Sequence, residues 1–279
     1  MDSVIYKKQL KELLESIRLQ QKSIGFVPTM GALHKGHAAL VTKAKAENNL
    51  VVVSIFVNPT QFNDKTDLEK YPRTLAADKQ LLEQIGCDIV FIPEVKEIYP
   101  EKDTRIFNFG SLEKVMEGAH RPGHFNGVAQ VLSKFFEITG ACKAYFGQKD
   151  FQQVAIVKAL VKQQNYPVTI VTCSTVREID GLAMSSRNLR LTAEERAIAP
   201  LIYSLLLQIK ERSASESPAG LKLFMEKELK KHPKFKLEYI EIADAATLQP
   251  LNDLKGTTQA VACIAVTLGS VRLIDNILL

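Results

Sequence analysis

Two histidines three residues apart stand out in a glycine-containing loop near the start of the chain. His34 and His37 lie in the stretch PTMGALHKGH at residues 28–37, where an extended segment gives way to a helix. This spacing places both imidazoles on one side of a helical turn. The helix start adds unpaired N–H groups, and Gly31 and Gly36 allow close backbone approach, so the expected ligand is phosphate. The alternatives are two surface histidines, or a zinc site with no third ligand apparent nearby.

A second candidate is the amide-rich turn FVNPTQF at residues 56–62, which follows a nearly continuous apolar run at 50–57. Its side-chain amides suit a pocket that hydrogen-bonds a neutral or carboxylate-bearing substrate. An ordinary Asn-Pro turn is the alternative.

The stretch 118–128 contains several His, Arg and Gly residues directly before a helix. It is either a positively charged loop near the substrate or a plain surface loop.

The stretch FGQKDFQQ at residues 146–153 also stands where a strand gives way to a helix. Gly147 permits close backbone contact, and the Lys149 ammonium can neutralise phosphate charge. Gln153 lies three residues after Asp150 on the same helical face. The alternative is a helix-capping Asp150 beside a solvated lysine.

The stretch MSSRN at residues 184–188 places two hydroxyls beside Arg187. These groups form a compact anion-binding set, because a guanidinium can bind phosphate in a bidentate manner. A segment between two domains is also well placed to close over a nucleotide. A structural linker is the alternative interpretation.

Short β-branched runs alternate with helical patterns over the first two-thirds of the chain, which predicts an α/β fold. The expected architecture is a Rossmann-like, doubly wound parallel sheet, whose ligands bind beyond the carboxyl ends of the strands. The expected strands are 23–28, 50–57, 88–92, 144–146 and 168–173, and the expected helices are 38–47, 75–85, 127–138 and 151–164.

The pattern changes after about residue 185 and predicts a smaller C-terminal α+β domain. Helices are expected at 193–212 and 221–232, and strands at 237–243, 260–268 and 271–275. We therefore expect a nucleotide-binding and catalytic domain at residues 1–176 and a lid domain at residues 177–279.

Composition places the chain among ordinary globular proteins. Of 279 residues, 46% are hydrophobic and 24% charged, and the formal net charge of +5 suits an anionic small molecule as well as nucleic acid. No apolar run approaches the roughly 20 residues that span a bilayer, and the first residues lack the apolar core of a signal peptide. The four cysteines show no metal-binding spacing and are interpreted as buried thiols. We expect a cytoplasmic protein.

Six motifs taken together resemble the pantoate–β-alanine ligase family (pantothenate synthetases) of the nucleotidyltransferase superfamily, over nearly the whole chain. They are PTMGALHKGH at 28–37, FVNPTQF at 56–62, YPRTLAAD at 71–78, RPGHFNGV at 121–128, FGQKDFQQ at 146–153 and REIDGLAMSSRN at 177–188. The resemblance implies that ATP and pantoate form pantoyl adenylate and pyrophosphate. β-Alanine then attacks the adenylate to give pantothenate and AMP.

The resemblance also implies residue roles. His37 is the proton donor, with His34 on the phosphates, and Gln61 binds pantoate and β-alanine while Gln153 binds pantoate. Catalysis is further assigned to Lys149, Ser185, Ser186 and Arg187. The implied ATP contacts are Met30, Gly31, Ala32, Leu33, His34, Lys35, Gly36, His37, Gly147, Gln148, Lys149, Asp150, Val176, Met184, Ser185, Ser186 and Arg187. Mg²⁺ is expected with the triphosphate, without an identified protein ligand, and a homodimer is implied.

Two other functions remain open at this point. A nucleotidyltransferase of the same superfamily acting on another acceptor explains the two histidines but not NPTQF or RPGHFNGV. A non-catalytic RNA-binding module is suggested by the Lys-rich segment 210–236. That segment also contains acidic residues and lacks interleaved aromatic residues, which favours a solvated helix face. Neither nucleic acid nor a membrane is therefore expected as a partner.

Overall fold

The computed structural model describes residues 1–62 and 65–279. The chain divides into two compact units that alternate along the sequence. The first unit comprises Met1–Phe109, Arg121–Gln148 and Gln153–Ser174, and the second comprises Gly110–His120, Lys149–Gln152 and Thr175–Leu279. Two short segments from the first part of the chain thus belong to the second unit, whereas the expected division runs through one point, between residues 176 and 177.

The first unit contains a six-stranded sheet in which every pair is parallel. Its strands are β1 (Asp2–Val4), β2 (Ile24–Thr29), β3 (Leu50–Ile55), β4 (Ile89–Phe91), β5 (Cys142–Gly147) and β6 (Val168–Cys173). The order β1-β4-β3-β2-β5-β6 reverses direction between β2 and β5. In a doubly wound sheet, the crevice at this reversal is where ligands bind.

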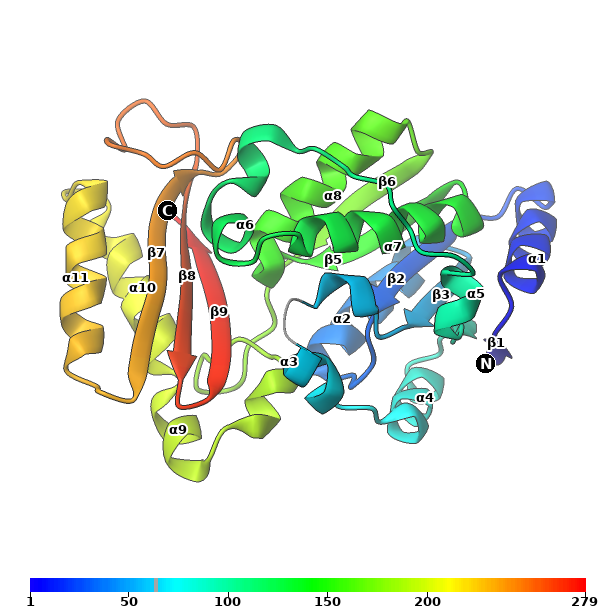
Figure 1. Ribbon diagram of the computed structural model, residues 1–279, viewed down its shortest axis with the longest axis horizontal. Coiled ribbons are helices and arrows are strands. Elements are labelled where there is room, and N and C mark those ends of the chain that lie inside the picture. Colours follow the sequence, from blue (N-terminus) through cyan, green and yellow to red (C-terminus); the bar gives the residue numbers. More distant parts are fainter. Residues whose placement is uncertain (63–64) are drawn as a thin grey trace. The chain divides into compact units, whose positions relative to one another are not determined.

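Helices cover both faces of this sheet, as Figure 1 shows. On one face, α2 and α4 contribute Val41 and Leu82 to a core with Val53 of β3. On the other face, Phe135 of α7 packs edge-on against Phe26 of β2 and further rings, and α1 packs against α7. The helices of this region are α1 (Lys7–Leu19), α2 (Lys35–Glu47), α3 (Lys65–Lys70), α4 (Leu75–Gln84), α5 (Val95–Ile98), α7 (His124–Thr139) and α8 (Phe151–Gln164).

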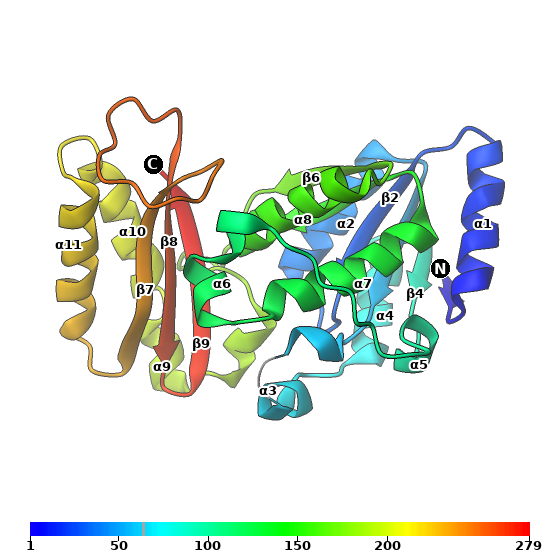
Figure 2. The same cartoon turned by 45° about the horizontal axis from the view of Figure 1, so that its top comes forward.

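The second unit contains a three-stranded antiparallel sheet in the order β7-β8-β9. Its helices α10 and α11 lie on one face of that sheet (Figures 1 and 2) and pack into its apolar core through Leu206 and Met225. The elements are α6 (Met116–His120), α9 (Ala193–Ile198), α10 (Leu201–Arg212), α11 (Pro218–Lys230), β7 (Phe235–Asp244), β8 (Ala260–Leu268) and β9 (Val271–Leu278). The expected fold class is therefore confirmed.

The clearest difference from expectation is the helix predicted over residues 193–212. It is two helices, α9 and α10, with Pro200 between them as the residue that precedes α10. Proline lacks an N–H and restricts the preceding residue, so it interrupts one helix but suits the start of the next. The predictions also omitted strand β1 and helix α1 at the amino end, where the strand is only three residues long.

Candidate active site

The two histidines lie side by side at the start of α2, directly after the loop that follows β2. Their ring centroids are 4.1 Å apart. The Nδ1 atom of His34 accepts a hydrogen bond from the amide of Gly36 (3.1 Å), and the Nδ1 atom of His37 accepts one from the amide of His34 (3.3 Å). Because an accepting Nδ1 carries no proton, each neutral ring holds its proton on Nε2. Each imidazole can therefore act as an Nε2–H donor.

A buried carboxylate holds the loop that precedes these histidines. Asp78 of α4 is 2% exposed, and its two oxygens accept the consecutive amides of Ala32 (3.0 Å) and Leu33 (2.8 Å). The Thr74 hydroxyl donates a third hydrogen bond (3.0 Å). Ala32 and Gly31 have positive φ angles of 50° and 82°, a conformation that costs free energy for alanine. Asp78 therefore stabilises a strained turn that sets the start of α2.

The amide of Gln61 is oriented by a chain of hydrogen bonds. The carbonyl of Gly127 can only accept, so Asn58 presents its Nδ2 to that carbonyl (3.0 Å) and to Gln61 Oε1 (3.1 Å). Gln61 consequently directs its Nε2 group away from Asn58, where it lies 2.9 Å from the Met30 sulfur. Met30 belongs to the histidine loop, so the two segments after β2 and β3 meet here. The Gln61 amide offers N–H donors suited to a carboxylate or hydroxyl.

Tyr99 and His124 complete the surroundings of this turn. The Tyr99 hydroxyl donates to Asn58 Oδ1 (2.9 Å), and burial raises the pKa of Tyr99 to about 12, so the hydroxyl keeps its proton. His124 is 6% exposed and its Nδ1 lies 2.8 Å from the Gln61 carbonyl, to which it donates. Its Nε2 faces an Arg121 nitrogen at 3.1 Å. The loop around residues 121–124 therefore contacts the Gln61 turn.

Helix α7 approaches this turn so closely that residue 127 must be a glycine. A Cβ atom on Gly127 would lie 2.2 Å from the Thr60 carbonyl oxygen and 2.7 Å from the Gln61 Cα. The short 3₁₀ helix Pro59–Gln61 thus packs directly on the backbone of α7. The motifs at 56–62 and 121–128 are therefore in direct contact in the folded protein.

Within the second unit, the expected phosphate-binding residues form a turn at Ser186–Arg190. Ser185 caps this turn by accepting the amide of Arg187 (3.2 Å), and the Ser186 side chain is buried. The amide of Met184 donates to the Val176 carbonyl (3.0 Å), so these two expected ATP contacts are paired. Lys149 also belongs to this unit; its ammonium lies 3.7 Å from the Asp150 carboxylate.

The candidate residues thus follow the carboxyl ends of several strands. Met30–His37 follows β2, Gln61 follows β3, and Gln148 follows Gly147, the last residue of β5, beside the reversal in strand order. Gln153 lies half-buried on α8 in the first unit. The remaining residues, Lys149, Asp150, Val176, Met184, Ser185, Ser186 and Arg187, belong to the second unit.

Sequence reasoning missed the residues that hold this site in place. Asp78, Asn58 and Tyr99 received no role, although Asp78 ends the motif YPRTLAAD and Asn58 lies within NPTQF. The available signal for Asn58 was a polar residue directly after the nearly continuous apolar run at 50–57. Nothing in the sequence connects Tyr99 to that turn, since they meet only through the tertiary structure.

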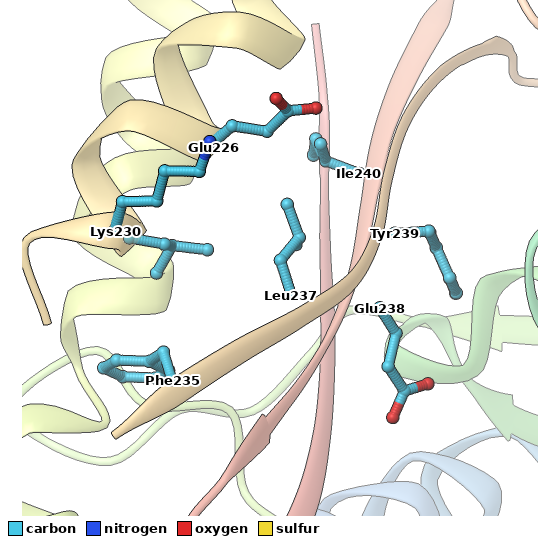
Figure 3. A pocket seen from close by; sticks show the side chains of 8 residues that line it. Glu226, Lys230, Phe235, Leu237, Glu238, Tyr239 and Ile240 are labelled. Carbon is cyan, nitrogen blue, oxygen red and sulfur yellow. The ribbon is translucent and has the colours of Figure 1, made fainter. Parts of the chain in front are cut away.

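A cavity of about 460 Å³ lies elsewhere in the second unit, between α11 and β7 (Figure 3). Glu226 and Lys230 line it from the helix, and Leu237 and Ile240 line it from the strand. The candidate residues named above lie on other segments. The residues that line this cavity are thus distinct from the candidate site residues.

The described residues contain neither a cluster of metal ligands nor a helix suited to a membrane. Within residues 1–62 and 65–279, no group of three or more His, Cys, Asp or Glu side chains could hold a metal ion. No helix in that part of the chain is both long and apolar enough to cross a membrane.

The four cysteines are free thiols, and burial raises the pKa of Cys87 to about 11.

Comparison with known proteins gives a consistent result over the full chain. The model of a family described as pantoate-beta-alanine ligase matches residues 3–278. The chain is 53% identical over 268 residues to pantothenate synthetase of Porphyromonas gingivalis, covering 96% of this chain and 95% of the relative. It is 55% identical over 271 residues to pantothenate synthetase of Phocaeicola vulgatus, covering 97% and 96%.

Solved structures agree with this result. The crystal structure of pantothenate synthetase from Thermus thermophilus is similar with a TM-score of 0.92 and 42% identity, covering 99% of each chain. Pantoate-beta-alanine ligase from Francisella tularensis, complexed with beta-gamma ATP and beta-alanine, is similar with a TM-score of 0.83 and 39% identity. That match covers 100% of this chain and 97% of the other.

Proposed function

Because the chain belongs to the pantoate–beta-alanine ligase family, we propose that its two histidines and its Gln61 turn serve an ATP-dependent ligation. The enzyme condenses (R)-pantoate with β-alanine and releases AMP and pyrophosphate. The observation that carries the residue assignments is the histidine pair, whose Nδ1 atoms both accept backbone amides. This arrangement puts the proton of each neutral ring on Nε2 at a helix start, where phosphate binds favourably.

In the first half-reaction, the pantoate carboxylate attacks the α-phosphorus of ATP. A P–O bond forms to the carboxylate, and the bond to pyrophosphate breaks, giving pantoyl adenylate. Negative charge accumulates on the phosphoryl oxygens and the leaving pyrophosphate, so positioned donors accelerate this step. We assign that role to His34 and His37, with His37 protonating the leaving group. The substrate carboxylate is the nucleophile, so no side-chain nucleophile is required.

The remaining ATP contacts are proposed on the basis of residue chemistry. Met30 to His37 supply backbone amides and imidazoles, and Gly147 and Gln148 supply backbone that a phosphate can approach. Lys149, Ser185, Ser186 and Arg187 supply the cationic and hydroxyl donors that phosphate oxygens require. Asp150, Val176 and Met184 complete the proposed nucleotide contacts.

Gln61 is proposed to bind both pantoate and β-alanine, and Gln153 is proposed to bind pantoate. The Asn58 hydrogen bond orients the Gln61 amide so that its Nε2, beside the Met30 sulfur, is the donor group, which suits the carboxylate and hydroxyl oxygens of pantoate. In the second half-reaction, the β-alanine amine attacks the acyl carbon of the adenylate. A C–N bond forms, the C–O bond to AMP breaks, and the amine loses a proton.

We further propose Mg²⁺ as the counter-ion of the triphosphate. In nucleotide sites Mg²⁺ keeps several waters and binds substrate phosphates rather than an all-protein cage. Such an ion would arrive on ATP and screen the charge of the triphosphate. A homodimer and a cytoplasmic location belong to the same proposal.

Pyrophosphate exchange into ATP tests the first half-reaction directly. We expect exchange that requires pantoate and proceeds without β-alanine, followed by release of AMP and pantothenate when β-alanine is added. Absence of exchange from folded protein that binds ATP would overturn the proposed acid substrate. Retention of the nucleotide on the product would instead identify a nucleotidyltransferase acting on another acceptor.

A further inference from the structure

Strand β9 carries two consecutive buried polar residues near its end. Asp275 and Asn276 are 5% and 3% exposed, in a strand that otherwise buries apolar side chains such as Leu273. Successive residues of a strand point to opposite faces of the sheet. Burying polar groups costs free energy unless they are hydrogen-bonded, so the partners of these two side chains show what they stabilise.

The partner of Asp275 is Arg177, the first residue of the motif REIDGLAMSSRN. The two nitrogens Nη1 and Nη2 of Arg177 donate to the two carboxylate oxygens at 2.6 and 2.9 Å, in a bidentate pair. Nη1 also donates to the Gly181 carbonyl (3.1 Å), and the guanidinium lies 3.5 Å from the centre of the Tyr203 ring. Arg177 is therefore fixed on several sides and links β9 to this segment.

Residues 176–184, which contribute Arg177 to this ion pair, form a closed hairpin. Arg177 and Ala183 form an antiparallel bridge, and the Met184 amide donates to the Val176 carbonyl (3.0 Å). Val176 and Met184 are proposed ATP contacts, and Ser185 follows directly. Asp275 thus contacts, through Arg177, the segment that carries these proposed nucleotide contacts.

Asn276 makes an equivalent connection to Lys149. Its Nδ2 donates to the main-chain carbonyl of Lys149 at 2.9 Å. Lys149 is the lysine proposed to neutralise phosphate, and its backbone is held by a residue 127 positions away in sequence. Because β9 also pairs with β8 along its length, Asn276 is a rigid support for that backbone.

We propose that Asp275 and Asn276 are positioning residues for nucleotide binding, acting through the 176–184 hairpin and through Lys149. The inference rests on the proposed function and extends it to two residues of the last strand, which touch no reacting atom. These two neighbouring side chains position the backbone of the 176–184 hairpin and of Lys149, which are distant from β9 in sequence. Loss of either contact should weaken ATP binding while pantoate binding is retained.

The variant Asn276→Ala removes the contact with Lys149. We expect the KM for ATP in pantoate-dependent pyrophosphate exchange to rise about tenfold, the scale of one lost hydrogen bond to a well-placed group. The KM for pantoate should change less than about twofold. Asn252→Ala, at an exposed position of the same unit, is the matched control and should change neither constant. Equal changes in both KM values for Asn276→Ala would overturn the positioning role.

The variant Asp275→Asn tests the contact between Asp275 and Arg177. It leaves Arg177 facing a neutral amide, and we expect the same selective rise in the KM for ATP. Asp244→Asn on β7 is the control, since that carboxylate accepts hydrogen bonds from the exposed turn at residues 246–247. If Asp275→Asn fails to fold, Asn276→Ala alone decides the matter.

A double-mutant cycle separates positioning from general support of the fold. The loss caused by Asn276→Ala should largely disappear in a Lys149→Ala background, because Asn276 acts through that side chain. Additive losses would overturn the proposal. Direct binding of a non-hydrolysable ATP analogue, measured by calorimetry, provides a readout independent of catalysis. Selective weakening of analogue binding by Asn276→Ala would support the positioning role, whatever the result of the exchange assay. If the wild-type protein failed to exchange pyrophosphate with pantoate, that result would contradict the proposed function and not the positioning role.

Discussion

At the scale of single residues, proton placement decides what the candidate site can do. The amides of His34 and Gly36 occupy the Nδ1 atoms of the histidine pair and so direct an Nε2–H group outward from each ring. Asn58 does the same for the Gln61 amide by accepting on one side and donating on the other. A static network of ordinary hydrogen bonds thereby assigns donor roles to three side chains before any ligand binds.

His37→Ala should lower the rate of adenylation at least about a hundredfold, the scale of losing one good transition-state donor. Pyrophosphate exchange at saturating ATP and pantoate measures this step. His232→Ala, which removes a histidine whose ring contacts Phe235 in the second unit, serves as the control. Near-normal exchange by the His37 variant would contradict the assignment.

Gln61→Ala should impair pantoate binding more than ATP binding, because the lost amide faces the proposed acid pocket. We expect the KM for pantoate to rise at least about tenfold, consistent with the loss of one or two hydrogen bonds to a charged group. Gln208→Ala on α10 is the matched control. An equal loss for both ligands would argue against Gln61 lining the acid pocket.

At the scale of elements, the site depends on how closely neighbouring segments approach one another. Helix α4 supplies the Asp78 carboxylate that holds the turn before α2, and α7 lies against the backbone of Pro59–Gln61. Each contact joins a loop that contains candidate site residues to a helix that contains none of them. The loops are therefore ordered by contacts with neighbouring helices in addition to the local hydrogen bonds of their own residues.

Asp78→Asn should slow adenylation by about ten- to a hundredfold. The amide can accept only one of the two N–H groups of Ala32 and Leu33, and an unsatisfied buried donor costs about 1–3 kcal/mol. The second substitution Ala32→Gly should restore part of the lost rate, because glycine adopts the positive φ angle without strain. Failure of any rescue would mean that the carboxylate does not act through this turn.

Gly127→Ala should disrupt the contact between α7 and the Gln61 turn. The added methyl would overlap the Thr60 carbonyl, so the two backbones must separate. We expect destabilisation of about 1–3 kcal/mol and a raised KM for pantoate, measured by urea unfolding and by exchange kinetics. Gly220→Ala on α11, whose Cβ would have its nearest neighbour at 3.5 Å, should leave both quantities nearly unchanged. Similar behaviour of the two variants would contradict the close-packing argument.

At the scale of the whole molecule, stability should depend on pH through ion pairs of the first unit. The hydrogen bonds that Arg105 donates to Asp103 lower the pKa of that carboxyl to about 2. A carboxyl with a lowered folded-state pKa stabilises the protein above its unfolded pKa near 4. That contribution is lost as the pH falls through about 2.

The free energy of unfolding should therefore fall between about pH 4 and pH 2, and Asp103→Asn should remove part of that dependence. At pH 7 the variant should be less stable by about 1 kcal/mol, a value reduced by the partial exposure of Arg105. Chemical denaturation across this pH range provides the measurement. A variant that keeps the full pH dependence would place its origin at other groups.

The sequence by itself determined the fold class, the family and most strand and helix positions of the parallel sheet. Those features follow from local periodicity and from motifs whose residues are near neighbours in the chain. Helix α8 and strands β6 and β8 lie at their predicted bounds, since apolar pattern and turn residues agree there. Pro200 also indicates a helix break from the local sequence alone, although the helical pattern of residues 193–212 continues across it.

Only the tertiary structure decided which distant residues support the site. Asp78, Tyr99 and Asn276 lie on other elements than the groups they hold, and no spacing along the chain connects them. The same is true of the division into units, in which residues 110–120 and 149–152 join the carboxyl-terminal part. Periodicity reports which face of an element is buried, but a hydrogen bond between remote side chains depends on how the elements pack.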